Sequence, residues 1–169
     1  MKGTKRMVLC AIFLSLALVL SYFERFIPLQ LAIPLPGVKL GLANIVTLSV
    51  MYLMGARYAY VILILRCVMG AMFGGGVTAL AFSLTGGLMA LTVMLAARYV
   101  PVFSVYGVSI LGAAAHNVGQ ILAAVFIMDS IYIIGYLPYL LAVGLCTGFA
   151  TGGACAGILR IMGRAKMAE

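Results

Sequence analysis

The segment Val105–Met128, VYGVSILGAAAHNVGQILAAVFIM, predicts one membrane-crossing helix that carries polar side chains at its centre. A helix rises about 1.5 Å per residue, so a segment of this length covers the roughly 30 Å hydrocarbon core of a bilayer. His116, Asn117 and Gln120 interrupt its apolar sequence. Because lipid cannot satisfy such groups, we expect them to face the interior of a bundle or a water-filled cavity.

The composition of the whole chain agrees with a membrane protein. Of its 169 residues, 66% are hydrophobic and 8% are charged, and the mean hydropathy is +1.25. This leaves too little polar surface for a water-soluble globule. The net charge of +8 comes mostly from basic residues between apolar segments or at the chain ends, where they set membrane topology. We therefore do not expect nucleic-acid binding.

The apolar segments predict an all-α integral membrane protein, a compact bundle of six transmembrane helices in a single domain of residues 1–169. Each segment has about 17 to 25 predominantly apolar residues, the length that crosses a bilayer. The predicted spans are about 7–27, 38–55, 57–73, 77–97, 104–128 and 138–160.

Basic residues predict the orientation of this bundle in the cell membrane. With both termini in the cytoplasm, the outer side holds only Arg25 and Lys39. The cytoplasmic side holds the larger set, as the positive-inside rule requires: Lys2, Lys5, Arg6, Arg57, Arg98, Arg160, Arg164 and Lys166. The proline-containing segment FIPLQLAIPLPGVK, residues 26–39, then lies on the outer face, either as a lid or as a connector.

Arg66 is the most informative polar residue. At 1.5 Å per residue it lies roughly 13 Å beyond Arg57, close to the middle of the membrane. The chain has only three acidic residues, Glu24, Asp129 and Glu169, and none lies deep in a span. A guanidinium at this depth is costly without a partner, so an anionic or strongly accepting ligand could supply one.

We predict a substrate-binding cluster in the outer half of the bundle. His116, Asn117 and Gln120 lie three or four residues apart and are expected on one helical face. The predicted substrate-binding residues are Lys39, Asn44, Arg66, Thr78, His116, Asn117 and Gln120, with Thr78 the weakest candidate.

A structural alternative exists for each part of this cluster. His116 and Asn117 could hydrogen-bond a neighbouring helix, which contributes about 1 kcal/mol. Glu24, Asp129 or carbonyl oxygens could satisfy Arg66. The four cysteines include no CxxC pair and no histidine at ligand spacing, so no metal site, disulfide framework or cofactor is expected.

The segment PLPGVKLGLANIVTLSVMYLMGARYAYVILILRCVMGAMFGGG, residues 34–76, resembles the substrate-binding S components of energy-coupling factor importers. More narrowly it resembles the Gx transporter family, which also carries the description heptaprenyl diphosphate synthase component I. The likeness extends over nearly the whole chain, including the HN pair at His116-Asn117. It implies a subunit that captures a vitamin-like molecule on the outer face.

The resemblance also implies partners. S components dock on a transmembrane coupling subunit driven by two ATPases through an Ala-xxx-Ala motif in the first span, which falls on Ala11 and Ser15 here, with serine in the second position. The chain itself is not expected to be an enzyme, because prenyl elongation needs clustered aspartates to hold magnesium. Two other interpretations stay open: a non-catalytic membrane accessory in isoprenoid or quinone synthesis, and a scaffolding membrane protein.

Overall fold

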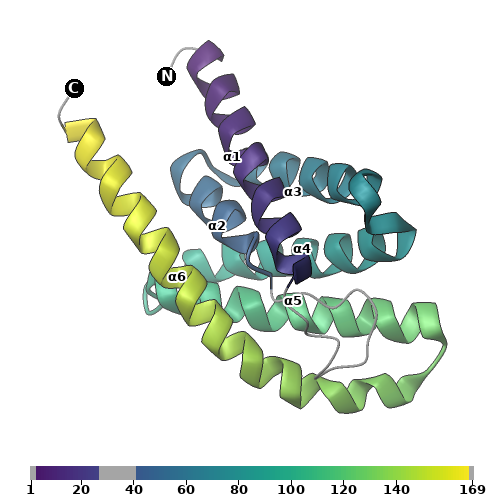
Figure 1. The fold of residues 1–169 in the computed structure, drawn as a ribbon. Coiled ribbons are helices and arrows are strands. Elements are labelled where there is room, and N and C mark those ends of the chain that lie inside the picture. The colour runs from purple at the N-terminus through teal and green to yellow at the C-terminus, as the bar shows by residue number, and fades with distance from the viewer. Residues whose placement is uncertain (1–2, 27–40, 168–169) are drawn as a thin grey trace.

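The computed structural model describes residues 3–26 and 41–167, and every regular element within these ranges is helical (Figure 1). The longer elements are α1 (Gly3–Phe23), α2 (Asn44–Leu53), α3 (Ala56–Gly70), α4 (Gly76–Arg98), α5 (Val105–Met128) and α6 (Leu137–Met167). The shorter ones are η1 (Glu24–Phe26), η3 (Ala71–Gly75) and η4 (Ile131–Tyr136). The prediction of an all-α membrane protein is confirmed at this level.

Helix α5 has the bounds that its sequence predicts. A capping residue stands at its start and a left-handed residue at its end. The Ser104 side chain accepts a hydrogen bond from the backbone N–H of Gly107 at 3.4 Å, which caps the first turn. At the other end Asp129 adopts a left-handed conformation with φ of 47°, which ends the helix.

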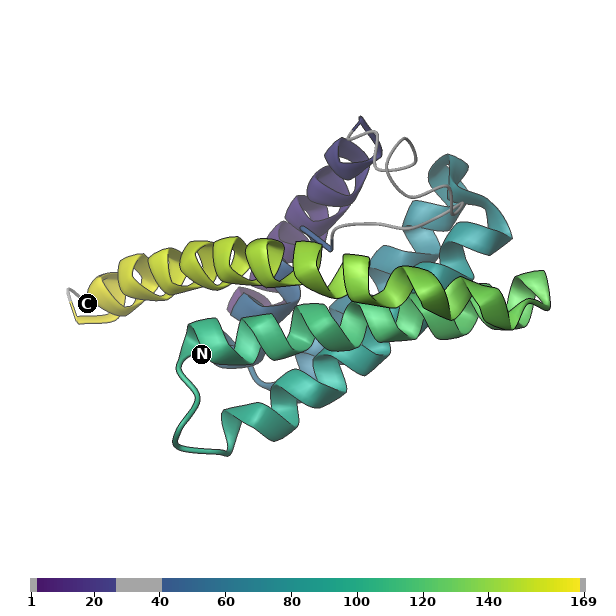
Figure 2. The ribbon, with the colours of Figure 1, turned by 90° about the horizontal axis from the view of Figure 1, so that it is seen from below.

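Helices α4, α5 and α6 pack side by side, with α5 and α6 antiparallel (Figure 2). The α6 glycines make this contact close. A Cβ atom on Gly148 would lie 2.8 Å from the Cα atom of Ile110, and one on Gly152 would lie 3.0 Å from that of Tyr106. The face of α6 that carries Gly148 and Gly152 therefore packs against α5 within the same chain.

Helices α3 and α4 form an antiparallel hairpin (Figure 1). Together they make one apolar helical stretch, Ala56–Arg98, which is too long for a single crossing. The chain reverses in η3, a π-helical segment in which Phe73 and Gly74 leave the helical region, with Gly74 at φ 93°. Glycine permits this conformation because it has no Cβ atom.

The second predicted span is wrong in its length. Helix α2 has 10 residues, about 15 Å, which is half the thickness of the hydrocarbon core. Positive φ values at Gly41 (82°) and Gly55 (97°) end the helix on both sides. Among the described residues, four stretches are long and apolar enough to cross a membrane, so six separate spans are not confirmed: Gly3–Phe23, Ala56–Arg98, Val105–Met128 and Ile131–Gly163.

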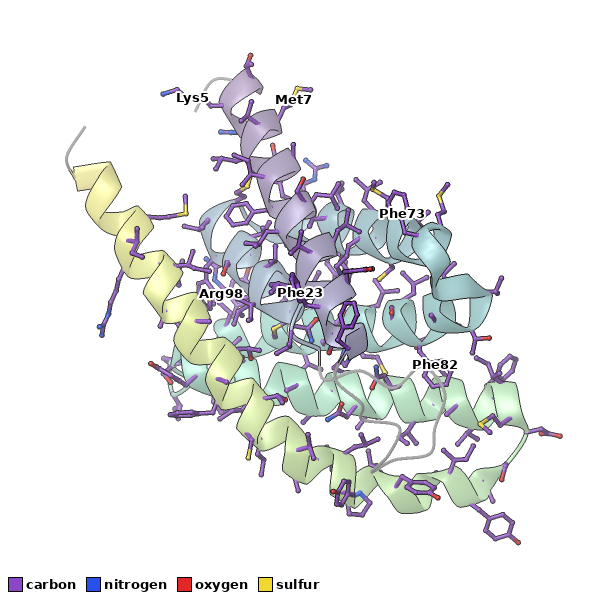
Figure 3. The ribbon with its side chains drawn as sticks, in the orientation of Figure 1. Lys5, Met7, Phe23, Phe73, Phe82 and Arg98 are labelled. Carbon is purple, nitrogen blue, oxygen red and sulfur yellow. The ribbon has the colours of Figure 1, made fainter. Side chains whose placement is uncertain are left out.

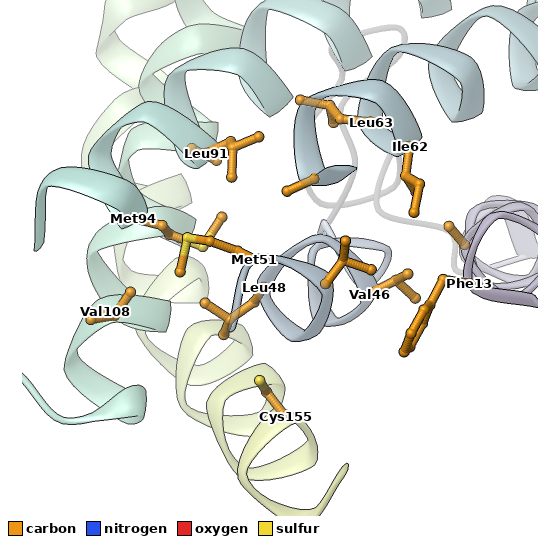
Figure 4. Close-up of a cluster of buried hydrophobic side chains, with 14 of the residues drawn as sticks. Phe13, Val46, Leu48, Met51, Ile62, Leu63, Leu91, Met94, Val108 and Cys155 are labelled. Carbon is orange, nitrogen blue, oxygen red and sulfur yellow. The ribbon is translucent and has the colours of Figure 1, made fainter. Parts of the chain in front are cut away.

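Helix α2 is surrounded mainly by the protein itself. Val46, Leu48, Val50 and Met51 are all buried. They form the centre of a hydrophobic cluster that includes side chains of α1, α3, α4, α5 and α6 (Figure 4). The other helices carry exposed apolar side chains, among them Met7 and Phe23 of α1 and Phe73 of η3 (Figure 3). Such a surface fits a multi-pass membrane protein.

We predict that Gly119→Ala destabilises the bundle. A Cβ atom at Gly119 would lie 2.8 Å from the Cα atom of Gly86 and 2.9 Å from the carbonyl oxygen of Thr85, so α4 and α5 would have to separate. Overpacking of this kind costs about 1–3 kcal/mol. Thermal unfolding in detergent, followed by circular dichroism, measures the loss.

Gly157→Ala is the matched control, because an added Cβ atom there has no neighbour within 4 Å. Alanine favours helix over glycine by roughly 0.5–1 kcal/mol, so this variant is expected to be at least as stable as the parent chain. Equal unfolding temperatures for the two variants would contradict a close α4–α5 contact.

Candidate functional site

Arg66 lies on the buried face of α3 and is 6% exposed. Its Nη1 atom donates to Ser21 Oγ of α1 at 3.4 Å, and its Nη2 atom lies 3.9 Å from Cys67 Sγ. Among the described residues, its Nε atom has no hydrogen-bond partner. Both contacts are long and involve neutral groups, so the guanidinium keeps donor capacity that no described residue uses.

The carboxylate of Glu24 is buried and binds backbone groups at the start of α2. Its Oε1 atom accepts hydrogen bonds from the N–H groups of Gly41 and of Leu42, the latter at 3.3 Å. These bonds join the end of α1 to the turn that precedes α2. In the part of the chain that the structure describes, the partners of Arg66 are a hydroxyl and a thiol and include no carboxylate.

A small cavity borders the guanidinium. It is formed by Ser21 of α1, by Arg66, Cys67 and Gly70 of α3, by Ala71 of η3 and by Ser83 of α4. Its volume is about 10 Å³, which is room for roughly one water molecule. A larger anionic group would need the wall to move, and the adjoining part of that wall is the irregular segment η3.

A pair of glycines in α4 positions both Arg66 and His116. A Cβ atom on Gly87 would lie 3.5 Å from Arg66 Nη2, and one on Gly86 would lie 3.0 Å from His116 Nδ1. The guanidinium of Arg66 and the imidazole of His116 therefore approach neighbouring positions of α4. Any larger residue at either glycine would collide with a side chain or with the backbone of α5.

His116 is enclosed between two glycines. On its other side, a Cβ atom on Gly41 would lie 3.6 Å from His116 Nε2 and 2.9 Å from Asn44 Nδ2. His116 and Asn44 thus both lie beside Gly41. The Oδ1 atom of Asn44 has no hydrogen-bond partner within the described ranges, so it is a second buried polar atom with unused capacity.

Asn117 and Gln120 are also buried, but Asn117 serves a different contact. Its Nδ2 atom donates to the carbonyl oxygen of Leu140 in α6 at 2.7 Å. This is the interhelical bond that the structural alternative proposes for the HN pair. His116 therefore packs on α4, and Asn117 bonds to α6. Binding roles for His116, Asn117, Asn44 and Gln120 stay predictions.

The remaining predicted residues lie away from the cavity or outside the described chain. Thr78 is exposed at the start of α4 and does not line the cavity beside Arg66. Lys39 and nearly all of the proline-containing segment 26–39 lie outside the described residues. Ala11 and Ser15 are both exposed on α1, where a partner could reach them.

Sequence reasoning missed the residues that shape the surroundings of Arg66. Ser21 and Ser83 come from α1 and α4 and meet Arg66 only in the folded bundle. The Gly86-Gly87 pair is visible in the sequence, and two adjacent glycines inside a predicted span are a signal of close approach. Within the described residues, no group of three or more His, Cys, Asp or Glu side chains could hold a metal ion.

A model of one protein family, described as heptaprenyl diphosphate synthase component I, matches residues 13–158 of the chain. No curated protein and no solved structure shows a significant match. The family match includes α2, α3, α4 and α5 entirely, and so includes every described residue around Arg66 and His116.

We predict that Glu24→Ala lowers stability more than Glu24→Gln does. Alanine leaves the N–H groups of Gly41 and Leu42 without their acceptor, at a cost of about 1–3 kcal/mol, whereas glutamine keeps one side-chain oxygen. Thermal unfolding of the three proteins in detergent gives the ranking. If Glu24→Ala unfolds at the parent temperature, the carboxylate does not hold the start of α2.

Proposed function

The chain belongs to the heptaprenyl diphosphate synthase component I family, and from this premise we propose that it is a membrane subunit that binds an organic anion beside Arg66. The two ends of the described chain lie on the same side of the bundle (Figure 1). This supports the proposed orientation, in which both termini are cytoplasmic and the anion is bound in the outer half of the cell membrane.

The unused donor capacity of buried Arg66 carries this proposal. A guanidinium stays charged at every physiological pH, and burial removes most of its hydration. Its described contacts are long bonds to a hydroxyl and a thiol, which offset little of that cost. An anionic group in the adjoining cavity would accept charge-assisted hydrogen bonds, which are roughly twice as strong as neutral ones.

We propose further that this subunit is not itself a catalyst. Prenyl transfer to a diphosphate substrate needs several carboxylates to hold magnesium. The chain has three acidic residues in total, and the carboxylate of Glu24 is bound to backbone N–H groups at the start of α2. Any catalytic step therefore belongs to a partner protein.

The family description favours a role in heptaprenyl diphosphate synthesis as a non-catalytic accessory. A diphosphate is the kind of anion that a guanidinium binds well, because its oxygens accept from several N–H groups at once. In this setting the subunit would hold a diphosphate substrate or product at the membrane for a soluble partner.

A second setting is capture of an anionic, vitamin-like solute by an importer. The exposed surface of α1 at Ala11 and Ser15 favours it, because small residues there would let a helix of a transmembrane coupling subunit approach closely. Two ATPase subunits would then drive transport. The anion site beside Arg66 is common to both settings.

We predict that Arg66→Gln weakens binding of inorganic diphosphate by at least about tenfold, since loss of a charge-assisted contact typically costs 1.5–3 kcal/mol. Isothermal titration calorimetry on the full chain in detergent measures the dissociation constant. Arg57→Gln is the matched control, because Arg57 is an exposed arginine of the same helix. Equal affinity in all three proteins, each still folded, would refute the anion site.

The two settings differ in what α1 does. In the importer setting, Ala11→Leu combined with Ser15→Leu is expected to abolish solute uptake and ATPase association but to leave diphosphate binding unchanged. Native mass spectrometry of the parent and variant proteins, purified from cells, shows which partners remain. Recovery of a soluble prenyl synthase from both, with no ATPase subunits, would favour the accessory setting instead.

A further inference from the structure

An apolar groove of about 470 Å³ lies between α1 and the α3–η3 corner. Leu18, Val19, Tyr22 and Phe23 of α1 form one side, and Phe73 of η3 contributes to the other. Figure 3 shows Phe23 and Phe73 on these two elements. Val19, Tyr22, Phe23 and Phe73 are exposed, so the groove opens toward the surroundings of the bundle and not toward its core.

The groove adjoins the cavity beside Arg66. Ser21 and Gly70 line both spaces. The same Ser21 hydroxyl accepts the hydrogen bond from Arg66 Nη1. Ser21 and Gly70 thus separate the exposed apolar groove from a buried guanidinium by one layer of residues.

The depth of the groove fits a molecule with a polar head and an apolar tail. Tyr22 and Phe23 end α1, where the orientation proposed above places the outer membrane interface. Leu18 lies five positions earlier, about 7 Å deeper at the rise of an α-helix. The groove thus runs from the interface into the hydrocarbon region, as a hydrocarbon chain attached to a headgroup does.

Building on the anion site proposed above, we infer that the ligand is an amphiphile: its anionic head binds Arg66 and its hydrocarbon tail lies in the groove. A polyprenyl diphosphate has this chemistry. Lipid already provides apolar surroundings for a tail, so moving the tail into the groove gives no hydrophobic gain. The groove contributes its shape and position instead. It lets the tail stay among apolar groups while the head reaches a buried charge.

The test compares three probes: farnesyl diphosphate, inorganic diphosphate and farnesol. Affinities are measured by calorimetry on the full chain in lipid nanodiscs. In the parent protein, farnesyl diphosphate is expected to bind more tightly than either other probe. Val19→Trp fills the groove and is expected to weaken farnesyl diphosphate by about tenfold or more, the usual size of an overpacking penalty, without changing inorganic diphosphate.

Val8→Trp is the matched control. Val8 is an exposed valine of the same helix and does not line the groove, so this variant is expected to bind all three probes as the parent does. Thermal unfolding checks that both tryptophan variants are folded. Val19→Phe, a smaller filler, gives the same comparison where Val19→Trp is not folded.

The outcomes separate this inference from the function on which it rests. Equal binding of farnesol and farnesyl diphosphate would overturn the assignment of the head to Arg66. If Val19→Trp binds farnesyl diphosphate as the parent does, or if inorganic diphosphate binds the parent as tightly as farnesyl diphosphate, the tail assignment is overturned. The anion site still stands in that case, provided that Arg66→Gln weakens inorganic diphosphate. Failure of both diphosphates to bind the parent protein overturns the anion site and the tail assignment together.

Discussion

Close backbone contact between α4 and α5 is the constraint on which the rest of the structure depends. At Gly86 and Gly119 the two helices leave no room for a Cβ atom. This contact sets the imidazole of His116 against Gly86, while the neighbouring Gly87 gives room for the side chain of Leu63 and lies beside the guanidinium of Arg66. The α6 glycines extend the same arrangement to the other side of α5. Small residues thus fix where the large polar ones can go.

Among the described residues Arg66 has neutral hydrogen-bond partners, in a chain that has three acidic residues. Glu24, which is buried near the end of α1, satisfies the backbone N–H groups of Gly41 and Leu42. Those groups precede a helix that is almost wholly enclosed by protein, where an unmet N–H is costly. The described contacts place the Glu24 carboxylate at the start of α2 and place neutral groups at Arg66.

The anion site and the groove together describe one kind of ligand in physical terms. Arg66 lies beside a cavity that adjoins the proposed groove of exposed apolar side chains. The cavity itself has a volume of about 10 Å³, so binding requires movement of its wall. The irregular backbone of η3 lies in that wall and offers a place for such movement. Whether the bound molecule is handed to an enzyme or to a transporter depends on partners of the subunit.

The sequence by itself determined the membrane class and the bounds of α5, because the hydropathy of a segment is a local property. It also singled out Arg66 as a buried polar residue. Only the tertiary structure decided that α2 is a short enclosed helix, that Asn117 turns to α6, and that Ser21 and Ser83 meet Arg66. Hydropathy cannot distinguish a helix surrounded by lipid from one surrounded by protein, and helical spacing cannot say which neighbour covers each face.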